Sequence, residues 1–202
     1  MTDTQAPLIV GLGGTVAVAS SSERITRKIL EACAARGART RLFAGPELDF
    51  PTYGTSDDRC GNARELVAAL REASGVVIVS PGYHGTISGM LKNALDYVQD
   101  MAKDERPYLD GRAVGLAAVA AGWQATGSTL ATLRAIAHAL RGWPTPLGVT
   151  INSLNPVFDA AGEFADPAVS GQVSAMADQL MEFARMRALA RAHGLGAHGA
   201  SA

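Results

Sequence analysis

Five short apolar runs alternate with longer segments of helical periodicity, and this alternation constrains the fold more than any other feature of the chain. Apolar residues occupy both faces of the runs, which is typical of parallel strands that are covered on two sides. Strands and helices in alternation imply βαβ units with right-handed crossovers. The sequence therefore predicts a doubly wound, three-layer α/β domain with five parallel strands and five helices. The predicted strands are Leu8–Gly13, Thr40–Phe43, Gly75–Ser80, Ala113–Ala120 and Leu147–Asn152.

The predicted helices carry apolar residues at spacings of three and four, which place those residues on one face of each helix. Ser22, Ser128 and the pair Asp166-Pro167 stand where the first, fourth and fifth helices are expected to begin. These residue types favour helix N-termini. The expected apolar faces are Ile25, Ile29, Ala32 and Cys33; Leu66, Val67, Leu70 and Ala73; Leu91, Ala94, Leu95 and Val98; Leu130, Leu133, Ala137 and Leu140; and Val173, Met176, Leu180, Phe183 and Ala184.

The length of 202 residues fits one large domain better than two. We assign residues 1–190 to that domain. Residues 191–202 are small and rich in glycine, alanine and histidine, so we expect them to form a flexible C-terminal tail. We therefore interpret His193 and His198 as tail residues rather than ligands.

Charge and composition argue against several functional classes. The formal net charge of −1 argues against a nucleic-acid-binding protein, which usually has an excess of basic residues. No run of apolar residues is long enough to predict a membrane span, and the N-terminus does not resemble a signal peptide. Cys33 and Cys60 are too few for a disulfide framework and lack metal-ligand spacing. We expect a soluble cytoplasmic protein with no metal site.

Ligands of such a fold bind beyond the carboxyl ends of the parallel strands. Two strand orders suit the pattern, Rossmann-like and flavodoxin-like, and both place ligands at this edge of the sheet. Three loops leave the expected strand ends there: Gly13–Ser22, Ser80–Gly89 and Ala121–Ser128. A fourth segment, Gly45–Asn62, is long for a compact domain, and such segments usually form a functional rim or a subunit contact.

The first loop has the composition of an anion site but contains no cation. It lacks the Lys-containing P-loop pattern, and Gly11 and Gly13 match only two positions of the dinucleotide fingerprint. What remains is a strand, a Gly-Gly-Thr turn and the serine run Ser20–Ser22 before a helix. Hydroxyls and unpaired amides at a helix N-terminus bind phosphate. From this loop alone, a phosphate site and a simple helix cap are about equally supported.

The second loop, SPGYHGTISGMLKNALDYV, presents Tyr83 where a flat aromatic ring can lie against a flat ligand. Gly85 allows the backbone to come close to such a ligand. Lys92, Asn93 and Asp96 fall off the apolar face of the following helix. They are either solvated surface residues, or Asn93 and Asp96 brace the long loop or a neighbouring subunit.

The pattern PxYxGxxxGxLKNxxDY in this second loop resembles the signature of the NAD(P)H-dependent FMN reductases, a family with the flavodoxin-like fold. The Gly-Gly-Thr turn with SSSER resembles the family's FMN-phosphate loop, and Ala121-Gly122-Trp123-Gln124 resembles its third flavin-side loop. The resemblance covers roughly residues 7–152. It implies the strand order 2-1-3-4-5, FMN at the strand ends and NAD(P)H as reductant. Many members are homodimers or homotetramers with FMN near the subunit contact.

The resemblance also implies roles for individual residues. Thr15, Ser20 and Ser22 would hold the FMN phosphate. Pro81, Gly82, Tyr83, His84 and Gly85 would line the isoalloxazine ring, and Gly122, Trp123 and Gln124 would lie at its other edge. No catalytic acid or base is needed for the flavin's own chemistry. His84 is the one candidate for proton transfer, with a backbone contact as the alternative role.

One departure from the family pattern concerns the first loop. Family members commonly have an Arg where this chain has Ala17. A hydrogen bond to a charged group contributes about 1.5–3 kcal/mol, so its loss would weaken FMN binding about ten- to a hundredfold. Arg24 is a possible substitute cation, although a solvated position on the first helix is the simpler expectation.

Three functions follow from these observations. In the first, FMN is itself a substrate, which is reduced and passed to a partner monooxygenase. In the second, FMN stays bound and a small-molecule acceptor such as a quinone, an azo compound or a specialised metabolite is reduced. In the third, the chain is a non-enzymatic electron carrier, but carriers of this fold use acidic faces, which a net charge of −1 does not favour. We expect the first.

Overall fold

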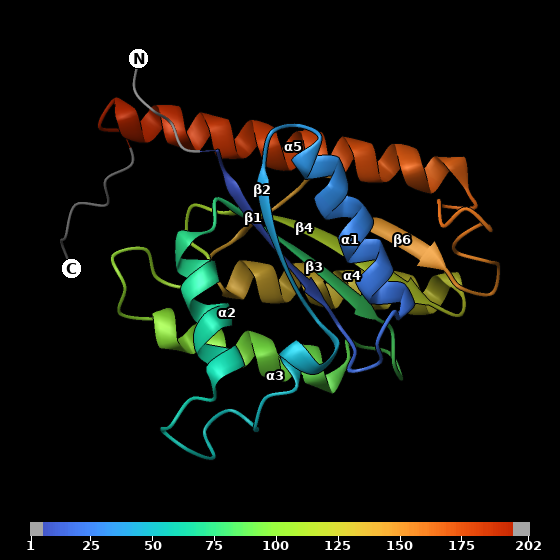
Figure 1. The fold of residues 1–202 in the computed structure, drawn as a ribbon, viewed down its shortest axis with the longest axis horizontal. Coiled ribbons are helices and arrows are strands. Elements are labelled where there is room, and N and C mark those ends of the chain that lie inside the picture. The colour runs from blue at the N-terminus through green and yellow to red at the C-terminus, as the bar shows by residue number, and fades with distance from the viewer. Residues whose placement is uncertain (1–5, 196–202) are drawn as a thin grey trace.

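The computed structural model describes residues 6–195, and it has the expected alternation of strands and helices (Figure 1). Short 3₁₀ helices occupy Gly45–Leu48 (η1) and Tyr97–Met101 (η2). The strands and α-helices, in chain order, are β1 (Leu8–Gly13), α1 (Ser21–Ala34), β2 (Arg39–Ala44), α2 (Gly61–Glu72), β3 (Gly75–Pro81), α3 (Gly89–Asp96), β4 (Ala113–Ala120), α4 (Trp123–Ala139), β5 (Trp143–Pro144), β6 (Val149–Asn152) and α5 (Pro167–Ala192).

The sheet is parallel throughout, and its order β2-β1-β3-β4-β5 confirms the flavodoxin-like arrangement. The fifth position differs from the prediction because two strands share it. β5 pairs with the start of β4, at Ala113 and Val114, and β6 pairs with the end of β4, from Ala117 to Ala120. Proline cannot donate a ladder hydrogen bond, so Pro144 and Pro146 fit this interrupted edge position.

The sheet is covered on both faces, as its continuously buried strands require (Figure 1). Along β1, the side chains of Leu8, Val10 and Leu12 pack with α2, α3 and α4. Ile9 points to the opposite face and packs with α1 and α5. Alternate residues of a strand point to opposite faces, so one apolar run supplies both layers of the core.

Two helices begin elsewhere than predicted. The N-cap of α1 is Ser20, whose Oγ accepts a hydrogen bond from the amide of Glu23, while Ser22 is buried inside the helix. The prediction of Ser128 as a cap is wrong, because α4 begins at Trp123 directly after Gly122. Each of these helix starts offers several equivalent caps: three consecutive serines at α1, and glycines and a serine near the start of α4. Sequence alone therefore does not select one. The start of α5 at Asp166-Pro167 is confirmed, with Asp166 accepting from the amide of Ala168.

The C-terminal helix extends further than predicted, through Ala192. His193 ends it, with its Nδ1 atom 2.8 Å from the carbonyl oxygen of Leu189. Residues 196–202 of the predicted tail, His198 among them, lie outside the described residues. No helix within residues 6–195 has both the length and the apolar character needed to cross a membrane.

Candidate functional site

A cavity of about 450 Å³ lies where β1, β3, β4 and β6 end, at the edge of the sheet where ligands of this fold bind. Its volume falls within the range of small-molecule sites. The first loop forms one wall, and the ends of β3 and β4 form another. The lining residues are Thr15, Ala17, Ser20, Ser21, Ser22, Pro81, Gly82, Tyr83, Val119, Ala120, Ala121 and Ser153.

The first loop is held close against the end of β3. The amide of Gly14 donates to the carbonyl of Val79 over 2.9 Å. A Cβ atom at Gly14 would lie only 2.8 Å from that same oxygen, so this position requires glycine. The buried hydroxyl of Ser88 donates to the Gly14 carbonyl over 2.5 Å and also caps α3 by accepting from the amide of Leu91. Ser88 therefore joins the first loop to the start of α3.

The first loop uses several of its own polar groups internally. The hydroxyl of Thr15 accepts from the amide of Ala17 over 3.1 Å. The hydroxyls of Ser20 and Ser22 are 3.2 Å apart. The carboxylate of Glu23 turns back and accepts from the amide of Ala19 over 2.8 Å. A carboxylate and hydroxyls thus hold the loop closed. Two of the predicted phosphate ligands, the N-cap residue Ser20 and Ser22 in the first turn of α1, lie together.

Within residues 6–195, no Arg or Lys is among the residues that line the cavity. The guanidinium of Arg24 lies over the ring of Phe158, 3.8 Å from its centroid, and so faces the segment that precedes α5. Arg27 pairs with Glu23 over 2.9 Å. The first two basic residues of α1 are therefore both engaged by other partners.

The second loop turns through a tight hairpin. Tyr83 and Thr86 exchange backbone hydrogen bonds of 2.8 and 3.1 Å, and the two residues between them, His84 and Gly85, both have positive φ angles. Such a turn needs positive φ at both central positions, which explains the glycine. Tyr83 is 52% exposed and lines the cavity, whereas His84 and Gly85 form the exposed tip of the hairpin.

The third loop is shorter than predicted. Gly122 has a φ of 101°, a conformation that favours glycine, and α4 starts at the next residue. The side-chain oxygen of Asn152, at the end of β6, accepts from the amides of Gly122 and Leu154 over 2.9 and 3.0 Å. Trp123, in the first turn of α4, is 65% exposed. Asn152 thus holds two loops of the cavity edge in place.

Six of the predicted FMN-binding residues line the cavity and five do not. Those that line it are Thr15, Ser20, Ser22, Pro81, Gly82 and Tyr83; those that are not among its lining residues in the described part of the chain are His84, Gly85, Gly122, Trp123 and Gln124. The FMN-binding role of all of these residues remains a prediction.

Sequence reasoning missed several lining residues at the strand ends. Val119 and Ala120 end β4 and Ser153 follows β6, whereas the lining residue Ala121 belongs to the predicted third loop. The rule that ligands lie beyond strand ends would have pointed to Ser153, since it directly follows a predicted strand.

The long segment between β2 and α2 packs on α3, which resolves the role of Asn93. Its side-chain oxygen accepts from the amide of Tyr53 over 2.8 Å, and its side-chain amide donates to the carbonyls of Phe50 and Pro51 over 3.2 and 3.1 Å. Asn93 therefore braces this loop, as one of the two interpretations expected. Asp96 instead forms a surface pair with Lys92 over 2.6 Å.

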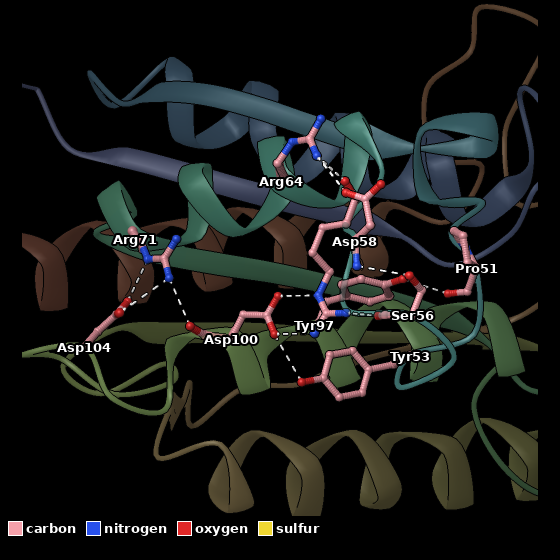
Figure 2. Close-up of polar contacts among 10 residues, drawn as sticks. Pro51, Tyr53, Ser56, Asp58, Arg64, Arg71, Tyr97, Asp100 and Asp104 are labelled. Atoms are coloured by element: carbon pink, nitrogen blue, oxygen red, sulfur yellow. Dashed lines mark hydrogen bonds and ion pairs between the residues drawn. The ribbon is translucent and has the colours of Figure 1, made fainter.

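A polar cluster fixes the middle of the same loop (Figure 2). Asp100 accepts hydrogen bonds from two nitrogens of Arg59, over 2.8 and 3.0 Å, and from the hydroxyl of Tyr53 over 3.1 Å. The hydrogen bond from Arg59 lowers the pKa of the Asp100 carboxyl below its ordinary value. Burial, followed by the hydrogen bond to Asp100, raises the pKa of Tyr53. Asp100 lies on η2, and Tyr53 and Arg59 lie on the loop between η1 and α2; none of the three is among the described residues that line the cavity.

Comparisons with known proteins agree with this geometry. Residues 7–154 match the family model of the NADPH-dependent FMN reductases. The chain is 31% identical over 157 residues to the NADPH-dependent FMN reductase ArsH of Shigella flexneri, covering 78% of this chain and 59% of that protein. It is 30% identical over 106 residues to an NADPH azoreductase of Bacillus sp. (strain OY1-2), covering 52% of this chain and 56% of that protein. The chain thus spans less than two thirds of the length of these curated relatives.

A solved structure supports the fold independently. The apo form of an NADH:FMN oxidoreductase (EMOB) superposes with a TM-score of 0.68 at 18% identity, covering 90% of each chain. At this identity the likeness concerns the fold alone.

Proposed function

The chain belongs to the family of NADPH-dependent FMN reductases, and from this premise we propose that it uses NAD(P)H to reduce FMN in the cavity at the strand ends. One observation carries the proposal. The cavity combines a cluster of hydroxyls at the N-terminus of α1 with a wall formed by Pro81, Gly82 and Tyr83. The first feature suits a phosphate, and the second suits a flat ring.

The donor set in the first loop fits the phosphate end of FMN. Four hydroxyl-bearing residues, Thr15, Ser20, Ser21 and Ser22, line the cavity, and the amides of Ser21 and Ser22 have no acceptor among the described residues. Unpaired amides in the first turn of a helix attract anions, because the helix dipole is positive there. We propose that these groups hold the phosphate.

When bound, FMN supplies two-electron chemistry between a nicotinamide and an acceptor. The residues of this chain therefore need only bind the flavin, orient it and shield it from side reactions. Tyr83 would cover one part of the ring, and the ends of β3 and β4 would support its edge. Asn152 would keep the third loop in position by holding the amide of Gly122. We assign no proton transfer to His84, because it lies at the hairpin tip rather than in the cavity lining.

We further propose that the flavin exchanges with solution and leaves as reduced product for a partner monooxygenase. No cation lines the cavity in the described part of the chain, and this supports the proposal, because a flavin that must leave cannot be held too tightly. The alternative, a bound flavin that reduces azo compounds, is supported by relatives such as the FMN-dependent NADPH-azoreductase of Staphylococcus saprophyticus, 29% identical over 133 residues.

We also propose a homodimer or homotetramer. Tyr83, Trp123 and Leu154 are exposed apolar side chains; Tyr83 lines the cavity, and the other two lie within two residues of the lining residues Ala121 and Ser153. Apolar side chains concentrated in one region of a surface are typical of subunit contacts. Light scattering coupled to gel filtration measures the oligomeric state, and a monomer at micromolar concentration would contradict this proposal.

Enzyme assays test the reaction and separate the two acceptors. We expect purified protein to oxidise NADPH or NADH in the presence of added FMN and to lose most of its flavin on gel filtration. Failure to oxidise either nucleotide, with free FMN or with an azo dye such as methyl red, would refute the enzyme proposal. Retention of one FMN per chain with methyl red reduction would favour the bound-flavin alternative.

A further inference from the structure

A second cavity, of about 300 Å³, lies at the opposite edge of the sheet, where β3 and β4 begin. Arg71, in the last turn of α2, lines it together with four residues of the segment before β4, which are Asp104, Glu105, Arg106 and Arg112. None of these residues is among the described residues that line the cavity at the strand ends. We call it the arginine cavity. Its volume is at the lower end of the range of small-molecule sites, so it suits a small ligand rather than a dinucleotide.

Arg112 places a buried charge in the wall of the arginine cavity. The residue is 1% exposed. Its Nη1 atom donates to the carbonyls of Tyr108 and Asp110, each over 3.1 Å, and its Nη2 atom donates to the carbonyl of Arg71 over 3.0 Å. Its Nε atom has no hydrogen-bond partner among the described residues. Burial, followed by the charge of Arg106, lowers the pKa of Arg112 to about 9. Neutral carbonyls thus fix this guanidinium without neutralising its charge.

Arg106 supplies donors that the protein itself uses only weakly. Its Nη2 atom makes long hydrogen bonds to the carbonyls of Ala73 and Asp110, over 3.4 and 3.5 Å. Its Nε atom is buried and has no partner, and its Nη1 atom donates to none of the described residues. Burial, followed by the charge of Arg191, lowers the pKa of Arg106 to about 10. An anion in the cavity would therefore meet a partly buried cation with an unused donor.

Positive charge exceeds negative charge around this cavity. The residues that line it with an ionic group, or whose charge acts on the pKa of Arg106 or Arg112, are five arginines and three carboxylates. They are Arg71, Arg106, Arg112, Arg187 and Arg191, with Asp104, Glu105 and Asp110. Asp104 already pairs with Arg71 over 2.8 Å (Figure 2). The excess matches the charge of one doubly negative ion.

The chemistry of the cations favours phosphate as that ion. The planar guanidinium matches the oxygens of phosphate and carboxylate, and hydrogen bonds to it are strengthened by charge. A single carboxylate carries one negative charge and would neutralise only half of the excess. A phosphate monoester carries close to two at neutral pH.

We propose that the arginine cavity is a binding site for the phosphate group of a small molecule, with Arg71 and Arg106 as the outer donors and Arg112 as the fixed charge behind them. The site lies at the other edge of the sheet from the cavity to which we assign the flavin, and the two share no lining residue in the described part of the chain. A phosphate compound can therefore bind while the flavin is in place.

Isothermal titration with inorganic phosphate, at an ionic strength held constant with sodium chloride, tests the site. We expect the natural chain to bind phosphate with a dissociation constant of about 1 mM or lower. Arg106→Gln should weaken binding about tenfold by removing a charged donor. Glu105→Gln should tighten it about threefold, because Glu105 lines the cavity and repels an anion. A general loss of folding cannot produce effects of opposite sign.

Arg64→Gln provides the matched control. Arg64 is on α2, its side chain is 65% exposed, and it pairs with Asp58 over 3.7 Å, away from the lining of both cavities. We expect this variant to bind phosphate as the natural chain does. Circular dichroism checks that each variant keeps its helical content.

Three results would overturn the inference. The first is no phosphate binding by the natural chain up to about 20 mM. The second is an unchanged phosphate affinity in folded Arg106→Gln, which would place the bound ion elsewhere, including at the first loop. The third is tighter binding of malonate, a dicarboxylate, than of phosphate, which would exclude phosphate as the preferred group. None of these results bears on the proposed function, which the flavin and nicotinamide assays test separately.

Discussion

Replacing Ser88 by alanine is expected to lower the free energy of unfolding by about 3 kcal/mol, because one buried hydroxyl serves two separate groups. Ser88 is 4% exposed. Its Oγ atom accepts from the amide of Leu91 at the start of α3 and donates to the carbonyl of Gly14 over 2.5 Å. Loss of an N-cap costs about 1 kcal/mol. A buried carbonyl left without a donor costs about 1–3 kcal/mol more.

Thermal unfolding followed by circular dichroism measures this effect. A loss of 1 kcal/mol shifts the midpoint by about 2–4 °C in a domain of this size, so we expect Ser88→Ala to unfold about 6–12 °C below the natural chain. Ser128→Ala is the matched control. Its exposed hydroxyl donates only to the carbonyl of Ala125 within α4, and its loss should shift the midpoint by less than about 2 °C. Equal shifts for the two variants would refute the reasoning.

Three further predictions concern the cavity and the long loop. Tyr83→Ala should weaken FMN binding about five- to tenfold by removing a ring contact, and an unchanged affinity in a fluorescence titration would exclude stacking. Asn93→Ala should lower the thermal midpoint by about 4–8 °C, because three hydrogen bonds to the loop are lost, whereas Lys92→Ala should have almost no effect. Arg59 lowers the pKa of Asp100, so the stabilisation by this pair is present above the unfolded pKa of about 4 and is lost as the pH falls through the lower folded value. In urea unfolding, the stability difference between the natural chain and Asp100→Asn should therefore shrink from pH 6 to pH 3, and a constant difference would contradict the assignment.

Several features of the fold and the candidate site could be predicted from sequence because they depend on short-range patterns. The buried runs of β1 and β4 were predicted with their observed bounds, since every position in them is apolar or glycine and every position is buried. Asp166-Pro167 marked the start of α5 because proline is restricted to the first turn of a helix. The strand order followed from the motif around Tyr83, not from periodicity, which left two orders open.

Other features depended on contacts that local sequence does not encode. By residue type, Ser20, Ser21 and Ser22 are equally suitable helix caps. In the structure α1 packs against β1 and β2, and Ser20 is the N-cap. The fifth strand position was predicted as a single strand. In the structure, β5 pairs with the start of β4 and β6 pairs with the end of β4, so the pairing is interrupted between them.

The sequence by itself determined the layers, the edge of the sheet where the cavity lies, and the absence of a basic residue between Gly13 and Arg24. Only the tertiary structure decided where the polar side chains at that edge point. Arg24 turned to Phe158, Glu23 turned back to Ala19, and Asn93 turned to the loop before α2. The physical reason is that apolar burial follows a repeating pattern along the chain. The direction of a long polar side chain depends instead on which donor, acceptor or ring the fold brings within reach.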